Sequence, residues 1–165
     1  MAKHLFIVRH AKSDWGFDVK DFDRPLNSRG FKDAPKMARL LADYAIKPQR
    51  LISSPAKRAI TTAQIFAEHL AIPVNEIKLE PEMYEALSTT LLQLICELDN
   101  GIDSVAFFGH NPSLTLLVNH LADEHIYSLT TCGIVHIRFD GVTDWSSISG
   151  GMGTAAWFAE PDKEG

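Results

Sequence analysis

Short runs of hydrophobic residues recur along the chain and predict buried β-strands. Leu5-Phe6-Ile7-Val8 and Val105-Ala106-Phe107-Phe108 are the clearest, and each run ends abruptly in polar residues. Continuous runs of this length are typical of strands that are buried on both faces, as in parallel sheets. The predicted strands cover residues 4–9, 50–53, 74–79, 104–108, 131–139 and 154–158.

Helical periodicity fills the segments between these strands. One helix is predicted from the Asn27-Ser28 cap to about Tyr44, because hydrophobic residues recur there every three or four positions. A second is predicted to begin at Ser54-Pro55, with Ser at the N-cap and Pro at the first helical position. Further helices are expected after Ser88 and after Pro112. This alternation predicts a three-layer α/β/α fold whose sheet is mostly parallel, with an antiparallel edge.

Composition narrows the class of protein. A chain of 165 residues with 45% hydrophobic residues is expected to form one domain spanning residues 1–165. No hydrophobic run approaches the ~20 residues of a membrane span. The first strand begins so early that we expect no signal peptide, no membrane association and a cytoplasmic location. Cys96 and Cys132 show no metal-type spacing and are expected to be buried free thiols.

The formal net charge of −5 argues against nucleic acid as a partner. It leaves room for a local anion pocket, because nearby charges dominate over distant, screened ones.

Polar residues gather at the ends of three predicted strands. Arg9-His10 ends the first, Arg58 lies in the first turn of the helix after the second, and Gly109-His110-Asn111-Pro112 follows the fourth. If these strands are parallel, the three groups lie on the same side of the sheet, where such folds bind ligands. A helix N-terminus adds free N–H groups and a positive dipole end, which favour phosphate.

These residue types suit phosphoryl transfer through a covalent phosphohistidine. A neutral His10 would attack phosphorus in line, while Arg9, Arg58 and a protonated His110 would stabilise charge on the equatorial oxygens. The two histidines would then need different pKa values and would titrate as a coupled pair. A zinc site at His10 and His110 is disfavoured, since catalytic zinc usually has three protein ligands and the arginines would repel the metal.

The segments Leu5–Ser13, Ser53–Ala63 and Gly109–Leu114 together resemble the histidine phosphatase superfamily, which has the phosphoglycerate mutase-like fold. The short chain and the stretch Asp23–Gly30 look most like SixA-type phosphohistidine phosphatases. One departure is Ala11, where the superfamily commonly has Gly.

The resemblance implies a role for each motif residue. His10 is implied as the phosphorylated nucleophile, and Arg9, Arg58 and His110 as the rest of the phosphate pocket. It also implies a carboxylate general acid after the third strand, for which Glu82 is the first candidate and Glu85 the second. No metal or other cofactor is implied.

The chemistry of the leaving group helps to predict the class of substrate. A phosphoserine leaves as an alkoxide, which needs a proton, whereas phosphohistidine leaves as an imidazole, whose pKa is about 6.5. An unclear general acid therefore favours phosphohistidine on a protein, such as a phosphotransfer domain. A small-molecule phosphomonoesterase of the same superfamily and a non-catalytic module that binds phosphorylated ligands are the alternatives.

The loop over residues 11–27 is long for a compact domain and is a candidate to contact substrate. Arg24 and Ser13 are its candidate substrate-binding residues, although Arg24 could instead neutralise Asp21 or Asp23. Trp15 and Phe17 are expected to pack within this loop, and the five histidines outside the motifs to lie on surfaces or strand edges.

Overall fold

A six-stranded sheet forms the middle layer of the computed structural model, which describes residues 1–15 and 18–162. The strand order is β3-β2-β4-β1-β5-β6; β3, β2, β4 and β1 are parallel, and β5 runs antiparallel to both of its neighbours. The strands are β1 (Ala2–Arg9), β2 (Arg50–Ser53), β3 (Lys78–Leu79), β4 (Ser104–Gly109), β5 (Ile134–Asp140) and β6 (Thr154–Ala159). The predicted mostly parallel sheet with an antiparallel edge is confirmed.

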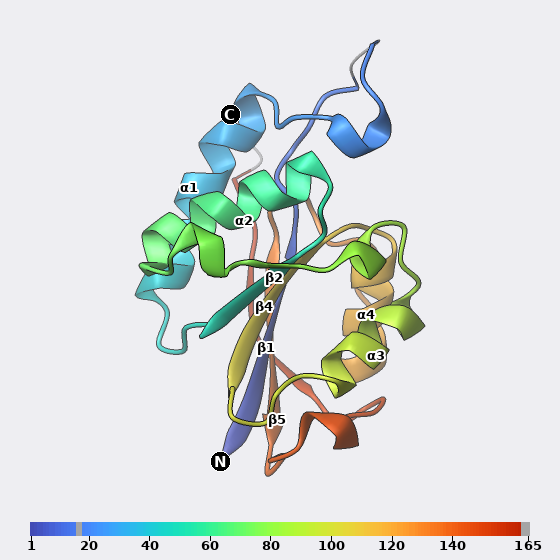
Figure 1. Cartoon of the computed structure of the whole chain (residues 1–165). Helices are drawn as coiled ribbons and strands as arrows, with labels where there is room; N and C mark the ends of the chain where they lie inside the picture. The colour runs from blue at the N-terminus through green and yellow to red at the C-terminus, as the bar shows by residue number, and fades with distance from the viewer. Residues whose placement is uncertain (16–17, 163–165) are drawn as a thin grey trace.

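Helices cover both faces of this sheet, with α1 and α2 on one side and α3 and α4 on the other (Figure 1). The helices are α1 (Ser28–Asp43), α2 (Lys57–Leu70), α3 (Ser88–Cys96) and α4 (Ser113–Ala122). Short 3₁₀ turns lie at η1 (Asp21–Asp23), η2 (Val74–Glu76), η3 (Pro81–Met83) and η4 (Trp145–Ser147). The three-layer α/β/α architecture follows. No helix within the described ranges is long and hydrophobic enough to cross a membrane.

The central strand explains why the first hydrophobic run is continuous. Successive side chains of a strand point to opposite faces. Leu5 and Ile7 pack in the core beneath α3 and α4, whereas Phe6 and Val8 pack beneath α1 and α2. All four side chains are fully buried, so this part of β1 needs hydrophobic residues at four successive positions.

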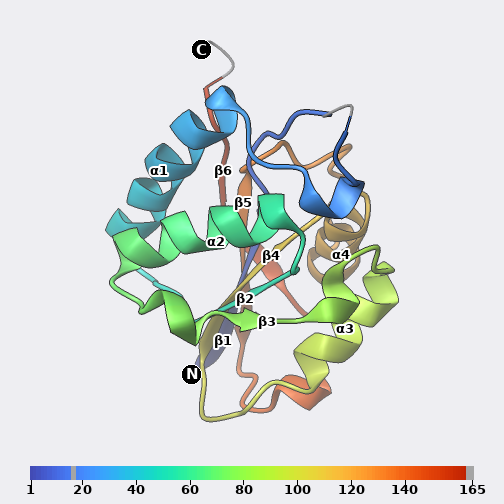
Figure 2. The same ribbon diagram turned by 45° about the horizontal axis from the view of Figure 1, so that its top comes forward.

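Register brings the ends of three strands together. Arg9 of β1 pairs with Gly109 of β4, and Ser53 of β2 pairs with Phe108 of β4, all in parallel. The residues that follow these strands therefore emerge at one edge of the sheet, as the sequence predicted. Figure 2 shows the start of α2 and the loops after β1 and β4 at this edge.

Two local predictions were wrong in detail. Helix α2 begins at Lys57, with Ala56 rather than Ser54 at its N-cap. The Ser54 hydroxyl accepts a hydrogen bond from the Ala56 amide at 3.2 Å, which forms a tight turn ahead of the helix. The predicted strand over 74–79 is mostly the 3₁₀ turn η2, and only β3 pairs with the sheet.

Both cysteines are free, as expected, although Cys96 is only half-buried. Cys132 was predicted to begin a strand, but it lies in a turn before β5 with a φ of 59°.

The start of α1 is held against the loop that follows β1. Asn27 caps the helix as predicted, because its side chain accepts from the Gly30 amide at 2.8 Å. The backbone N–H of Asn27 in turn donates to the Lys12 carbonyl at 3.0 Å. A Cβ at Gly30 would lie 2.2 Å from that carbonyl oxygen, so this contact requires glycine.

His136 of β5 is buried with only 2% of its surface exposed, so its predicted place at a surface or strand edge is wrong. Its two ring nitrogens lie 2.8 Å from His4 Nδ1 and 2.7 Å from the Tyr44 hydroxyl. Burial, followed by the neighbouring His4 and Arg138, lowers the pKa of His136 to about 4. The ring is therefore a neutral part of the core at neutral pH.

Gly30→Ala should destabilise the protein by about 1–3 kcal/mol, because the new methyl group must displace the backbone at Lys12. Chemical denaturation measures this loss of stability. Gly101→Ala is the control, since its Cβ would lie 3.4 Å from the flexible Asp99 side chain. Equal stability of the two variants would contradict the packing argument.

Acidification should destabilise the protein between about pH 6.5 and pH 4. Unfolded His136 binds a proton near pH 6.5, whereas the folded residue does so at about 4. The unfolded state thus binds more protons in this window, and stability falls as the pH falls. At pH 5, His136 accounts for a loss of roughly 1–2 kcal/mol in the free energy of unfolding. Chemical denaturation at pH 7.5 and pH 5 measures how much the free energy of unfolding falls. The fall should be smaller for His136→Gln than for the unsubstituted protein, and an equal fall would refute the lowered pKa of His136.

Candidate active site

The loops and helix start at the carboxyl edge of the sheet enclose a cavity of about 390 Å³. Arg9 and His10 come from the end of β1, Arg58 from the first turn of α2, and His110 from the residue after β4. The full lining consists of Arg9, His10, Lys12, Ser13, Trp15, Asp21, Arg24, Arg58, His110, Asn111 and Thr131. The structure therefore brings all three predicted motifs to one cavity.

His10 is oriented by its own backbone neighbour. Its Nδ1 lies 2.7 Å from the Ala11 carbonyl oxygen, which can only accept a hydrogen bond, so Nδ1 carries the proton. The lone pair of the neutral ring is consequently on Nε2. Burial is the main cause that lowers the pKa of His10 to about 3, and the nearby His110, Arg58 and Arg9 act in the same direction. The ring is neutral at pH 7 and its Nε2 is available as a nucleophile.

The residue after His10 is fixed by α2. The Ala11 amide donates to the Thr62 hydroxyl at 2.9 Å, and that hydroxyl donates to the Arg58 carbonyl at 2.8 Å. Ala11 is fully buried and is not among the positive-φ residues of the described chain. The methyl group that replaces the superfamily's usual glycine is thus accommodated without backbone strain.

Three buried nitrogens at the cavity have no hydrogen-bond partner within the described part of the chain: Arg9 Nε, Arg58 Nε and His110 Nδ1. The far ends of both arginines are anchored, since Arg9 Nη1 donates to the Leu129 carbonyl at 2.9 Å and Arg58 Nη1 to the Asp21 carbonyl at 2.7 Å. Leaving buried donors unpaired is costly. An anion with several acceptor oxygens would satisfy all three.

His110 is held by the turn that precedes α2. Its Nε2 lies 2.8 Å from the Ser54 hydroxyl, which already accepts from the Ala56 amide. The hydroxyl can still donate its proton to Nε2, and with that hydrogen bond Nδ1 carries the ring proton. Burial, and then Arg58, lowers the pKa of His110 to about 4. His110 is thus neutral in the free protein, whereas the protonated His110 was predicted for the state in which it stabilises a phosphoryl group.

Asp21 is the carboxylate that lines the cavity, and the sequence analysis missed its role there. Its Oδ2 lies 3.1 Å from Arg58 Nη2 and accepts from the Tyr84 hydroxyl at 2.6 Å. Its Oδ1 accepts from Arg24 Nε at 3.1 Å. The hydrogen bond from Tyr84 is the main cause that lowers the pKa of Asp21, and Arg58 adds to it. The i, i+3 spacing of Asp21 and Arg24 was the available signal.

The loop after β1 forms the mouth of the cavity. Arg24 and Ser13 line it as predicted, and Arg24 is buried beneath Trp15, whose ring centroid is 3.8 Å from the guanidinium carbon. Trp15 was expected to pack within the loop, but 77% of it is exposed. Phe17 lies outside the described residues.

Neither predicted acid reaches this cavity. Glu82 in η3 and Glu85 in the following turn are both exposed, and neither belongs to the lining. Tyr84, between them, points toward the site instead and contacts Asp21. No group of three or more potential metal ligands occurs within residues 1–15 and 18–162.

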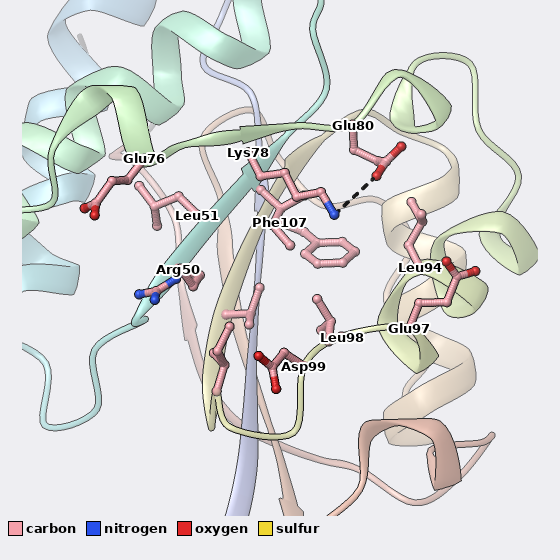
Figure 3. Close-up of a pocket in the computed structure, with 13 residues that line it drawn as sticks. Arg50, Leu51, Glu76, Lys78, Glu80, Leu94, Glu97, Leu98, Asp99 and Phe107 are labelled. Atoms are coloured by element: carbon pink, nitrogen blue, oxygen red, sulfur yellow. Dashed lines mark ion pairs between the residues drawn. The ribbon is translucent and has the colours of Figure 1, made fainter.

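A second cavity, of about 410 Å³, lies between β2, β3 and α3, away from the motif residues (Figure 3). Its floor is hydrophobic, with Phe107, Leu94 and Leu98, and its rim carries the Lys78–Glu80 ion pair at 3.9 Å. Its lining contains no histidine, whereas the smaller cavity holds His10, His110 and the arginines with unpartnered nitrogens.

Comparisons with known proteins agree with this geometry. The sequence model of the histidine phosphatase superfamily (branch 1) matches residues 5–86. An uncharacterized chloroplastic protein of Arabidopsis thaliana is 25% identical over 97% of this chain and 77% of its own length.

Solved structures extend the likeness over nearly the whole chain. A protein of Agrobacterium tumefaciens assigned as phosphohistidine phosphatase SixA superposes with a TM-score of 0.81 and 28% identity, covering 97% of this chain and 99% of that one. A protein histidine phosphatase SixA in complex with tungstate gives a TM-score of 0.73 and 27% identity over 94% of this chain and 95% of its own.

These relatives support a phosphatase activity, and Arg9, His10, Arg58 and His110 lie together in one cavity. The chain belongs to the histidine phosphatase superfamily.

Proposed function

We propose that this protein hydrolyses phosphohistidine on a protein substrate through a covalent phosphohistidine intermediate at His10. One observation carries the proposal: the free Nε2 of His10 shares a cavity with three unpartnered buried nitrogens, on Arg9, Arg58 and His110. The nitrogens match an anion with several oxygens, and the nucleophile adds the chemistry that simple anion binding does not need.

In the first step, the Nε2 lone pair of His10 attacks phosphorus. The Nε2–P bond forms as the bond to the leaving group breaks, and the electron pair of that bond goes to the leaving group. Charge on the equatorial oxygens is stabilised by the two arginines and by the His110 Nδ1–H, which are already in position. The Nδ1–H bond to Ala11 O stabilises the positive ring that forms at His10.

In the second step, water attacks phosphorus and the P–Nε2 bond breaks. The electron pair returns to Nε2, and both water protons stay on the product, which leaves as dihydrogen phosphate. His10 is again neutral, as its low pKa favours. The cycle needs no metal ion, and we propose a metal-independent enzyme.

The leaving group favours phosphohistidine over a phosphate ester. Asp21 is the carboxylate of the described cavity lining, and its lowered pKa keeps it ionised at neutral pH. An ionised carboxylate cannot protonate an alkoxide, whereas imidazole leaves without that help. The names of the SixA structures point to the same substrate class. The alternatives are a small-molecule phosphomonoesterase and a binding module, and the labelling and turnover measurements below separate them.

His10→Ala should abolish phosphorylation of the protein and lower turnover by about 10⁴-fold or more, because no other side chain replaces the nucleophile. Rapid quench with radiolabelled phosphohistidine-containing phosphotransfer protein should give acid-labile, base-stable label on the unsubstituted enzyme. His125→Ala, which changes an exposed histidine outside the cavity, is the control and should label normally. Absence of label on the unsubstituted enzyme, or label on His10→Ala, would exclude the covalent mechanism.

Turnover should be faster with a phosphohistidine protein than with small phosphate esters and should survive a metal chelator. Release of inorganic phosphate measures both, with and without EDTA. A preference for an ester would favour the small-molecule phosphomonoesterase, and loss of activity in EDTA would refute metal independence. Binding of phosphorylated ligands without turnover would favour the binding module.

A further inference from the structure

Asp21 places a carboxylate in a cavity lined by cationic side chains, and phosphate binding alone does not explain a negative charge there. Turn η1, which carries it, packs beside the first turn of α2 (Figure 2), so its carboxylate meets Arg58. Arg58 contacts Asp21 through both terminal nitrogens, at 2.7 Å to the backbone carbonyl and 3.1 Å to Oδ2. Its Nε stays unpartnered. One guanidinium can therefore hold Asp21 and a phosphoryl group at the same time.

The two carboxylate oxygens differ in what they can still accept. Oδ2 has two partners, Arg58 Nη2 and the Tyr84 hydroxyl, while Oδ1 has Arg24 Nε as its partner among the described residues. Each carboxylate oxygen has about two acceptor positions, so Oδ1 retains one. The Asp21 side chain is 40% exposed and lines the cavity, so a bound substrate can reach the carboxylate.

We propose that Asp21 selects the leaving group, with Oδ1 accepting a hydrogen bond from the ring N–H of a phosphorylated imidazole. This inference rests on the proposed function and names the residue that favours P–N over P–O substrates. Asp21 would hold the ring nitrogen that is not bonded to phosphorus in its protonated form.

The chemistry balances without a proton from the enzyme. The protonated phosphohistidine ring carries its proton on the nitrogen remote from phosphorus. When His10 Nε2 forms its bond to phosphorus, the substrate P–N bond breaks and its electron pair stays on the substrate nitrogen. The substrate histidine leaves as a neutral imidazole that keeps its proton. Without the remote proton it would leave as an imidazolate anion, a much poorer leaving group.

The same carboxylate works against an ester. An alkoxide or phenoxide leaves with a negative charge next to the Asp21 anion, and like charges repel. The pKa of Asp21 is lowered by Tyr84 and Arg58, so it has no proton to give at neutral pH. Asp21 thus assists one leaving group and opposes the other.

Asp21→Asn tests this role because the amide keeps the shape of the side chain and removes its charge. kcat/KM is measured for free phosphohistidine and for phenyl phosphate, so that the same phosphoryl pocket meets two leaving groups. We expect the preference for phosphohistidine to fall by about 10-fold or more. The basic limb of the phosphohistidine pH profile should also move to lower pH, because the ring proton is no longer held.

Two further variants support the comparison. Asp23→Asn makes the same charge change in the same turn at an exposed residue outside the cavity lining, and it should leave the ratio unchanged. Tyr84→Phe removes the hydroxyl that donates to Asp21 and should lower the ratio in the same direction, by less. It also provides a test if Asp21→Asn does not fold.

The outcomes separate this inference from the proposed function. If Asp21→Asn lowers kcat/KM equally for both substrates, with an unmoved pH profile, Asp21 only positions Arg58 and the inference fails while the function stands. If the unsubstituted enzyme turns over phenyl phosphate but not phosphohistidine, the proposed substrate fails, and the selectivity inference fails with it.

Discussion

The site depends on the parallel pairing of β4 with both β1 and β2. The pairs Arg9–Gly109 and Ser53–Phe108 align the ends of the three strands to within a residue. A slip of one residue in a sheet buried on both faces would exchange the side chains of its two faces. The same hydrophobic packing that fixes the core therefore fixes where His10, Arg58 and His110 lie.

The charges buried at this edge act in two ways. Arginine keeps its charge in a protein, whereas histidine gives up its proton when burial and neighbouring cations make the charged form costly. Arg9 and Arg58 accordingly stay positive beside a neutral His10 and a neutral His110. One arrangement thus favours binding of an anion and leaves His10 unprotonated.

Local patterns in the sequence were sufficient for the fold class and for the residues at the strand ends, because both follow from hydrophobic runs and their polar ends. They were insufficient for Asp21, whose position depends on η1 reaching α2 across 37 residues of sequence. Ser54 was predicted to cap a helix, but its hydroxyl is used by His110. Glu82 was chosen from its neighbours in sequence, while the turn at η3 directs Tyr84 to the site. Each of these outcomes is set by tertiary contacts that a local pattern does not contain.

In the proposed reaction, one group of residues in the site contacts the phosphoryl group and another contacts the leaving group. Under this proposal, the residues after the strands, with Arg58, face the phosphoryl group, which is the same in an ester and in phosphohistidine. The loop after β1 supplies Asp21, Arg24 and Trp15 at the mouth, where we propose that the leaving group lies. Arg58 contacts Asp21 with its terminal nitrogens, while its buried Nε has no partner within the described residues. In the proposed reaction, one guanidinium therefore links Asp21 to the phosphoryl group. If Asp21 selects the leaving group as proposed, a change in the loop can alter that choice only if it leaves Arg58 in place, because Arg58 belongs to both groups of residues.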